Sequence, residues 1–183
     1  MITIRKAKKE DAEFIARGLM TALWVPEEEQ EQKLPLRRTL SEMDNTLYSW
    51  HNAHIAQYDG VDAAVLISYD GASYAAASAT TFGYVRDNGE EDLTHMKHEA
   101  KAGEWYLDTL AVLPEFRRKG LATALLHHGI ELCRQNPATQ KVTLYVDPEH
   151  PKVVQLYSSL GFQPEGEDFI FGQMFTKMSI VTG

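Results

Sequence analysis

The segment between residues 104 and 146 constrains the fold most, because it reads as a strand, a tight turn, an amphipathic helix and a second strand. Glu104–Val112 (EWYLDTLAV) is typical of a strand, and Pro114 ends it because proline cannot donate to a ladder of backbone hydrogen bonds. Arg118–Cys133 carries apolar residues at helical spacing, and Lys141–Val146 (KVTLYV) is the following strand. The pattern predicts a βαβ unit, so its two strands should be parallel and its crossover right-handed.

The remaining elements predict an α/β (α+β) fold with a mixed central sheet of about six to seven strands flanked by helices. A chain of 183 residues is enough for one domain, and we expect residues 1–183 to form it. Further strands are expected at Met1–Arg5, Ala63–Tyr69, Ala72–Tyr84 and Phe169–Ile180, with Asp70-Gly71 as the hairpin turn between the middle two. Helices are expected at Lys8–Leu23, Pro35–Trp50, Leu93–Ala102 and Pro151–Leu160, with a turn through His51–Asp59 and Gly161 ending the last helix.

The charge and cysteine content of the chain argue against several classes of partner. The formal net charge is −8, from 18 Lys and Arg against 26 Asp and Glu, whereas surfaces that bind nucleic acid are usually basic. The single cysteine, Cys133, excludes an intramolecular disulfide, which fits a reducing compartment. The sequence has no signal-peptide pattern and no stretch of about 20 apolar residues. We therefore expect a cytoplasmic protein that binds neither nucleic acid nor membranes.

A local basic cluster, Arg117-Arg118-Lys119, stands out against this acidic background at the start of the predicted helix. Basic residues are unfavourable at a helix N-terminus, since they face its positive end, unless an anion neutralises them. The free N–H groups there can bind an anion, and Gly120 lets the chain turn tightly or lets a ligand approach the backbone. The residues alone leave two interpretations open, a site for a pyrophosphate-like anion and a solvated basic turn.

Two short motifs lie in this context. Arg117–Ala122 reads RRKGLA, and Leu156–Phe162, farther along the chain, reads LYSSLGF. With both in place, the chain resembles the GNAT superfamily of acyl-CoA-dependent N-acyltransferases. The phosphate-binding motif of that family is Gln or Arg, two residues, Gly, one residue, then Gly or Ala, and a Leu-Tyr-x-x-Leu-Gly-Phe signature follows downstream. The resemblance implies a GNAT fold, in which the fourth and fifth strands are parallel and splay apart.

The resemblance also implies that the chain binds acetyl-CoA as a cosubstrate. The backbone at the end of the fourth strand would pair with the pantetheine arm like an added strand, and the amides and basic side chains of the turn would hold the pyrophosphate. His150 stands where the family often has an Asn that bonds the pantetheine. The residues expected to bind CoA are Leu110, Ala111, Val112, Arg117, Arg118, Lys119, Gly120, Leu121, Ala122, Thr123 and His150.

The candidate catalytic residues are a tyrosine and two carboxylates. The resemblance makes Tyr157 the general acid that protonates the departing thiolate of CoA, and the alternative is a half-buried aromatic on a helix. Tyr106 and Tyr145 occupy the positions where some members carry a Glu as base. Strand alternation places Glu104, Tyr106 and Asp108 on one side of their strand. Glu104 is therefore the first candidate base and Asp108 the second, with a plain surface carboxylate as the alternative.

Other polar and aromatic residues predict no further site. His95, His98 and Glu99 lie at helical spacing, but no third or fourth ligand accompanies them, so we expect solvated residues and no metal. The three tryptophans are expected in the core: Trp24, Trp50 and Trp105.

Together, the residues and the resemblance predict an N-acetyltransferase that moves an acetyl group from acetyl-CoA to a primary amine by direct attack in a ternary complex. The regions expected to form the acceptor side, about residues 23–48 and the loop before Glu104, are acidic, which favours a cationic small molecule or peptide. A non-catalytic acyl-CoA-binding sensor with the same fold is the alternative, because the family Glu is absent. The identity of the acceptor, the acyl length and a homodimeric state are left open by the sequence.

Overall fold

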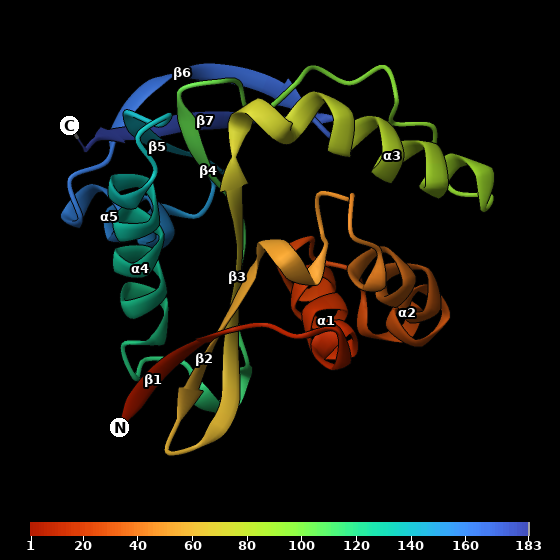
Figure 1. Cartoon of the computed structure of the whole chain (residues 1–183), viewed down its shortest axis with the longest axis horizontal. Coiled ribbons are helices and arrows are strands. Elements are labelled where there is room, and N and C mark those ends of the chain that lie inside the picture. Colours follow the sequence, from red (N-terminus) through yellow and green to blue (C-terminus); the bar gives the residue numbers. More distant parts are fainter. Residues whose placement is uncertain (183) are drawn as a thin grey trace.

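The computed structural model describes residues 1–182, which form one seven-stranded sheet with helices on both faces (Figure 1). The strands are β1 (Ile2–Lys6), β2 (Ala53–Tyr58), β3 (Val61–Asp70), β4 (Glu104–Val112), β5 (Lys141–Val146), β6 (Gln163–Ile170) and β7 (Gln173–Val181). The helices are α1 (Ala12–Ala22), α2 (Glu27–Glu42), α3 (Tyr74–Asp87), α4 (Leu121–Gln135) and α5 (Pro151–Ser159). Short 3₁₀ turns lie at Lys9–Asp11, Trp50–Asn52, Gly71–Ser73 and Pro114–Phe116.

The sheet is mixed and has the order β1-β2-β3-β4-β5-β7-β6. Its central pair, β4 and β5, is parallel, and the pairs on either side of it are antiparallel. The strands β4 and β5 have the predicted bounds, and α4 connects them as the crossover. The predicted mixed α/β fold with a central parallel pair is therefore confirmed.

The two parallel strands separate soon after they meet. In the described residues, β4 pairs with β5 only over Glu104–Tyr106 against Lys141–Thr143. Beyond this point β4 continues to pair with β3, and β5 with β7. Each strand therefore has an inner edge of backbone groups without a strand partner, and such an edge can accept an added strand.

A β-bulge in β4 lies where this separation begins. In the register with β3, Leu107 pairs with Ser68 and Thr109 with Ile67, so Asp108 is an extra residue. The bulge reverses the alternation of the strand: Tyr106 and Ala111 both belong to the core under α1–α3, although they are five positions apart in the chain. Bulges are common next to active sites, because they redirect side chains.

The helices divide between the two faces of the sheet (Figure 1). Side chains of α1, α2 and α3 pack on one face, around residues such as Ile15, Leu40 and Phe82. Side chains of α4 and α5 pack on the other, around Leu125 and Leu156. No helix within residues 1–182 combines the length and the apolar character that crossing a bilayer requires.

The expected hairpin at Asp70-Gly71 is wrong. The segment after it is α3, and the hairpin that precedes β4 joins β2 to β3 at Asp59-Gly60, so the expected turn through His51–Asp59 is largely strand β2. The Asp70 carboxylate accepts the N–H of Ala72 at 2.9 Å, which starts a 3₁₀ turn and then an alanine-rich helix. Gly71 is needed for another reason, since a Cβ there would lie 2.3 Å from the carbonyl oxygen of Lys101.

Three other predicted elements also differ from the structure. The expected strand Phe169–Ile180 is part of the hairpin β6–β7, whose turn is Phe171-Gly172. The expected helix Leu93–Ala102 is a series of turns and bends. The expected helix Pro35–Trp50 is the second half of α2, which begins at Glu27, contains Pro35 and ends at Glu42.

Candidate active site

The turn between β4 and α4 has the geometry of an anion site. Arg118 and Gly120 both have positive φ, 63° and 84°, so the chain curls around its own N–H groups. The helix α4 has no side-chain cap, and its first internal bond runs from the N–H of Ala124 to Gly120, at 3.0 Å. The three preceding N–H groups of the helix are therefore without an intrahelical acceptor. They border a hollow of about 270 Å³ whose lining includes Val112, Phe116, Arg117, Arg118, Gly120, Leu121, Ala122, Thr123 and Leu156.

The three basic side chains of this turn make different contacts. The Lys119 ammonium lies 4.8 Å from the centre of the Tyr58 ring and 4.9 Å from that of Phe116, so cation–π contacts hold it. Arg117 donates from Nε to the Val112 carbonyl at 3.4 Å, and its side chain lines the hollow together with that of Arg118. The turn is thus both basic and rich in free N–H groups, which are complementary features for a polyanion.

Gly120 serves the conformation of this turn. A Cβ at this position would meet nothing closer than Ile2 Cδ1, at 3.8 Å. Glycine is favoured because φ is positive, a conformation that costs free energy for residues with a side chain. A Cβ would also point into the space where an anion would approach the backbone.

Four of the residues predicted to contact CoA lie outside the turn. Leu110, Ala111 and Val112 form the end of β4, on the part of the strand that β5 does not pair with. His150 lies just before α5, where its ring stacks on Trp24 with centroids 4.9 Å apart, and its Nε2 is 3.6 Å from Asp147. The assignments of these residues to CoA remain predictions.

Tyr157 is partly buried on α5 and packs against Phe162, with ring centroids 5.9 Å apart. Burial raises the pKa of its hydroxyl to about 12, so the group holds its proton at neutral pH. The preceding residue, Leu156, lines the hollow at the start of α4, whereas Tyr157 itself lines neither that hollow nor the larger cleft. The structure therefore gives Tyr157 the protonation state that a general acid needs, and its role remains a prediction.

A larger cleft of about 680 Å³ opens on the α1–α3 face, a volume typical of small-molecule sites. Segments far apart in the sequence form it: the end of α1, the helices α2 and α3, the loop before β4, the bulge of β4, the end of β5 and the β6–β7 turn. Its charged lining consists of Lys33, Arg37, Glu90, Glu91, Glu99, Asp108 and Asp147.

Asp108, the second candidate base, lies in this cleft. Its carboxylate accepts hydrogen bonds from the Tyr69 hydroxyl at 2.6 Å and from the Thr109 hydroxyl at 2.9 Å. Burial raises the pKa of Asp108 to about 6, although both hydrogen bonds favour the ionised form. A carboxyl with such a pKa can accept a proton near neutral pH.

A second carboxyl, that of Glu99, lines the same cleft and is more deeply buried than Asp108. It is 9% exposed, so the expectation that it is solvated is wrong. The hydroxyls of Tyr106 and Tyr74 donate to it at 2.5 Å and 3.0 Å. Burial, followed by the charge of Asp108, raises the pKa of Glu99 to about 7. No motif pointed to Glu99, because its partners come from β4 and α3.

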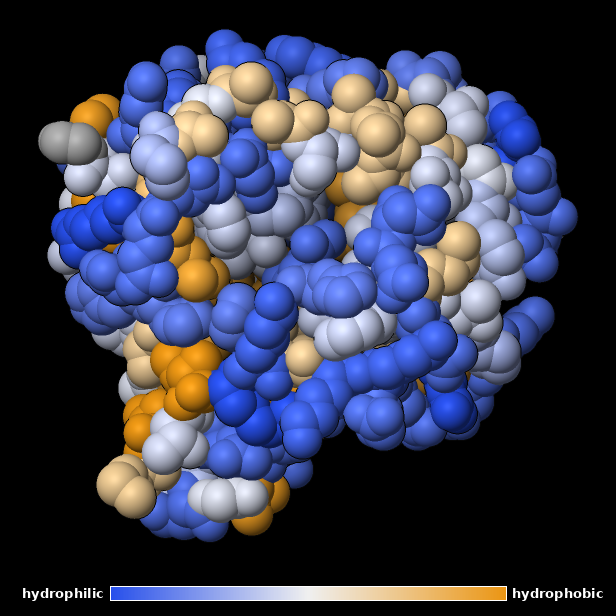
Figure 2. All heavy atoms as spheres, in the orientation of Figure 1, coloured by the Kyte–Doolittle hydropathy of each residue, from blue (hydrophilic) through white to orange (hydrophobic). Residues whose placement is uncertain are grey.

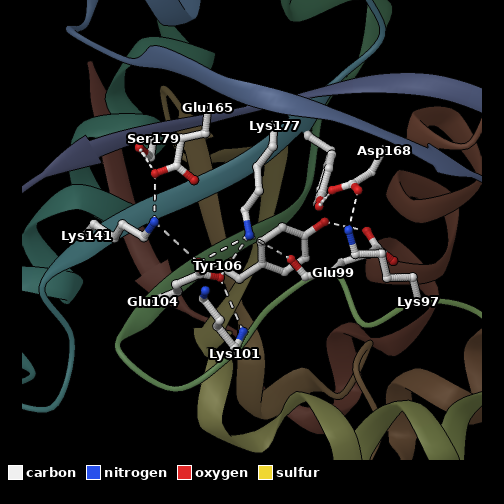
Figure 3. Close-up of polar contacts among 11 residues, drawn as sticks. Lys97, Glu99, Lys101, Glu104, Tyr106, Lys141, Glu165, Asp168, Lys177 and Ser179 are labelled. Carbon is white, nitrogen blue, oxygen red and sulfur yellow. Dashed lines mark hydrogen bonds and ion pairs between the residues drawn. The ribbon is translucent and has the colours of Figure 1, made fainter.

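Glu104, the first candidate base, has different surroundings, which Figure 3 shows. It is 1% exposed and does not line the cleft. Lys177 on β7 donates to both of its carboxylate oxygens, at 3.1 Å and 3.2 Å, and Lys141 lies 3.6 Å away. The Glu104 carboxylate is thus engaged by two lysines and lies away from the space in which an acceptor would bind. We therefore do not propose Glu104 as the base.

Lys177 also connects Glu104 to the loop that carries Glu99. Its ammonium donates to the backbone carbonyl of Glu99 at 3.3 Å (Figure 3). The neighbouring Tyr145 donates to Asp168 at 2.6 Å, and Asp168 is also paired with Lys97. These contacts fasten β6, β7 and the loop before β4 to one another beside the cleft.

Metal-binding side chains do not gather in the described part of the chain. Within residues 1–182, His, Cys, Asp and Glu form no group of three or more that could hold a metal ion. His95 and His98 are exposed, as expected.

The family of the protein follows from sequence comparison. The sequence pattern of the Acetyltransferase (GNAT) family matches residues 17–162. The chain belongs to this family. Two solved structures share the GNAT fold: an N-acetyltransferase from Staphylococcus aureus, with a TM-score of 0.78 and 22% identity over 97% of this chain and 100% of that chain, and a further acetyltransferase, with a TM-score of 0.76 and 23% identity over 99% of this chain and 100% of that chain.

Curated relatives of this GNAT protein match over a shorter stretch. The cysteine-rich protein 2-binding protein of Mus musculus is 37% identical over 70 residues, which are 38% of this chain and 8% of the relative. The chain thus matches less than a tenth of that relative's length. The match says nothing of the substrates of this GNAT protein.

Proposed function

We propose that this GNAT protein transfers an acetyl group from acetyl-CoA to a primary amine in the space between β4 and β5. The observation that carries the proposal is the position of Asp108. It is the bulged residue of β4, it lies where β4 and β5 separate, and its half-buried side chain lines the cleft. A proton acceptor is thus placed beside the gap in which the resemblance puts the pantetheine.

The chain offers a fitting site for CoA. The turn with two positive φ values and three helix N–H groups without intrahelical acceptors suits a pyrophosphate, and Arg117 and Arg118 line the hollow beside it. The unpaired inner edge of β4 near Leu110 and Val112 suits the amide groups of the pantetheine arm. When bound, acetyl-CoA supplies the acetyl thioester.

The protein's own groups then handle two protons. An amine near neutral pH arrives mostly as an ammonium and must lose a proton before it can attack. Asp108, with its pKa of about 6, is largely ionised at neutral pH and accepts that proton. Tyr157, with its pKa of about 12, retains its proton until the thiolate departs and then donates it. Glu99 lines the same cleft, and the charge of Asp108 contributes to its raised pKa.

The rival function is a non-catalytic acyl-CoA sensor. The experiment that separates the two measures release of the CoA thiol from acetyl-CoA with a panel of primary amines at about pH 8, where the proposed base is ionised. We expect amine-dependent release, with acetylated amine detected by mass spectrometry. Stabilisation by CoA in thermal melting without release on any amine would favour the sensor.

The role of Tyr157 has its own test. Tyr157→Phe removes the hydroxyl and keeps the ring that packs on Phe162, so we expect kcat to fall about 100-fold with an unchanged affinity for CoA. Tyr84→Phe is a matched control, because Tyr84 packs against the core outside the cleft. Unchanged kcat in Tyr157→Phe would refute the assignment of the acid.

A further inference from the structure

Several acidic side chains of the acceptor side are paired with cations of the protein itself, whereas Glu27, Glu28, Glu91 and Asp92 form no ion pair within residues 1–182. Arg37 holds Glu90 through two contacts, at 2.6 Å and 3.0 Å. On α2, Glu29 pairs with Lys33 at 2.8 Å and Glu31 with Arg17 of α1 at 3.0 Å. The acidic composition of these segments therefore overstates the negative charge available to a polycationic acceptor, since part of it is already paired.

Large apolar side chains, by contrast, are left exposed in the lining of the cleft. Trp24, after α1, is 72% exposed, and Phe171, in the β6–β7 turn, is 43% exposed. The expectation that Trp24 belongs to the core is wrong. The face in Figure 2 is mostly hydrophilic with several apolar patches. Large apolar side chains are exposed elsewhere too, Phe169 among them, but the exposed area of Trp24 and Phe171 lies in the lining of the cleft.

Both aromatic residues also occupy backbone positions that bulky side chains avoid. Trp24 has a φ of 55° and ends α1 in a Schellman arrangement, in which the N–H of Val25 bonds to Met20 and that of Trp24 to Thr21. Glycine is the usual residue at such a position. Phe171 has a φ of 50° and precedes Gly172, at 81°, in a two-residue hairpin turn that favours Asn-Gly.

Such strained positions cluster at ligand clamps, and here two of them, from opposite ends of the chain, line one cleft. The Trp24 ring is already held by stacking on His150, with an interplanar angle of 18°, so less ordering is needed when a ligand binds. Below the aromatic side chains, the unpaired charges of the cleft include the carboxyls Asp108 and Glu99.

We infer that Trp24 and Phe171 bind the apolar body of the acceptor, and that the acceptor is a primary amine with a single positive charge beside an aromatic or branched apolar group. This inference rests on the proposed function and names the substrate class for that site. In this arrangement the ammonium group contacts the carboxyls of Asp108 and Glu99, and the apolar group lies against the two aromatic rings.

The first test compares three amines in the thiol-release assay: phenethylamine, ethylamine and putrescine. We expect kcat/KM for phenethylamine to exceed both of the others at least about tenfold, because one apolar group in a fitting pocket contributes a factor of that size or more. A preference for putrescine, or equal use of phenethylamine and ethylamine, would overturn the inference and leave the proposed function intact.

A binding measurement keeps the two claims separate. If no amine releases thiol, the proposed function fails, and fluorescence still decides the inference. Phenethylamine should quench the indole emission of the CoA-loaded wild type and should quench that of Trp24→Phe much less. Absence of quenching in the wild type, or equal quenching in the variant, contradicts the inference.

The strain of the two positions gives a second test. Phe171→Asn and Trp24→Gly place a favoured residue at each position, so we expect each to raise Tm by about 2–4 °C. Each should also lower the ratio of kcat/KM for phenethylamine to that for ethylamine about tenfold. Asp59→Phe is the matched control, because Asp59 has a φ of 50° in the β2–β3 turn, away from the cleft, and should lower Tm without changing the ratio. A higher Tm with an unchanged ratio in both cleft variants would falsify the role of the aromatic rings.

Discussion

The turn that we assign to CoA and the cleft that we assign to the acceptor are built in different ways. The turn uses backbone N–H groups of consecutive residues, Arg118–Thr123, and its shape depends on two positive φ values. The cleft uses side chains, and these come from α1, α2, α3, β4, β5 and the β6–β7 turn. A site made of consecutive backbone groups changes little when a side chain is replaced, whereas a site made of convergent side chains can change its ligand by substitution.

The two regions also differ in electrostatics. The turn is basic and solvent-accessible, so it contributes affinity for an anion. The cleft holds two carboxyls, the buried Glu99 and the half-buried Asp108, whose pKa values desolvation raises toward neutrality. Changes in the turn should therefore alter CoA binding, and changes in the cleft should alter the rate and its dependence on pH.

The largest expected effect is on the cleft. Asp108→Asn keeps the size and removes the proton acceptor, so we expect kcat to fall about 10²- to 10³-fold, with CoA affinity unchanged. The measurements are steady-state kinetics and CoA binding by calorimetry. Asp44→Asn, at an exposed carboxylate outside the cleft, should leave both values unchanged. An unchanged kcat in Asp108→Asn would show that another group is the base.

The next largest effect is on the turn. Gly120→Ala adds a Cβ at a φ of 84°, where the neighbouring N–H groups face an anion, and should raise the Kd for CoA about 10- to 100-fold. Gly60→Ala is the matched control, since Gly60 also has a φ of 84° and open space around it. Both substitutions should lower Tm by a similar amount, and only Gly120→Ala should weaken CoA binding. Equal CoA affinity in the two variants would contradict the phosphate site.

A smaller effect concerns the two carboxyls together. Glu99 has the higher pKa of the two, about 7 against about 6, so it is still mostly neutral when Asp108 ionises. Glu99→Gln should therefore leave the rise of kcat/KM with pH, which reports ionisation of Asp108, at the same pH. The raised pKa of Glu99, about 7 against 4.5 without the protein environment, stabilises the fold below about pH 4.5, and this stabilisation is lost as the pH rises through 7. At pH 8 the variant should therefore be more stable than the wild type, by on the order of 1 kcal/mol in urea unfolding. A shift of the pH profile to lower pH would contradict this order of ionisation.

The smallest expected effect is on the face of the sheet that α4 covers, opposite the cleft. His54 on β2 and His128 on α4 lie with ring centroids 4.5 Å apart, and burial followed by the charge of His128 lowers the pKa of His54 to about 4. Because the folded pKa is below that of the unfolded chain, stability is lost as the pH falls from about 6.5 toward 4. Over this pH range we expect the free energy of unfolding of His54→Gln to fall by about 1 kcal/mol less than that of the wild type. Parallel pH curves for the two proteins would refute the lowered pKa.

The sequence predicted the CoA side of the molecule well because its signals are local. Glu104–Val112 and Lys141–Val146 have the predicted bounds, and Pro114 and Gly120 mark the turn between β4 and α4. The Asp70-Gly71 pair misled, because the same dipeptide can start a helix when the Asp side chain caps the next turn. Local residues cannot tell which of these two structures the rest of the fold stabilises.

The acceptor side was harder to predict because its properties depend on contacts across the chain. Strand alternation made Glu104 a reasonable candidate base, but its carboxylate is paired with Lys177, 73 positions away in the chain. Glu99 was expected in solvent, but Tyr74, 25 positions away, and Tyr106 enclose it. No pattern within a strand or helix contains this information.

By itself, the sequence determined the parallel β4–β5 pair, the helix that connects them and the turn with its basic residues, because strand, proline, glycine and amphipathic helix signals act over a few residues. Only the tertiary structure decided which carboxyls face the cleft and which charges are already paired. It also brought Trp24 and Phe171, from opposite ends of the chain, into the lining of one cleft. The physical reason is that burial, pKa and charge pairing are set by neighbours in space. For this protein those neighbours lie as far apart in the chain as Arg37 and Glu90, which are 53 positions apart.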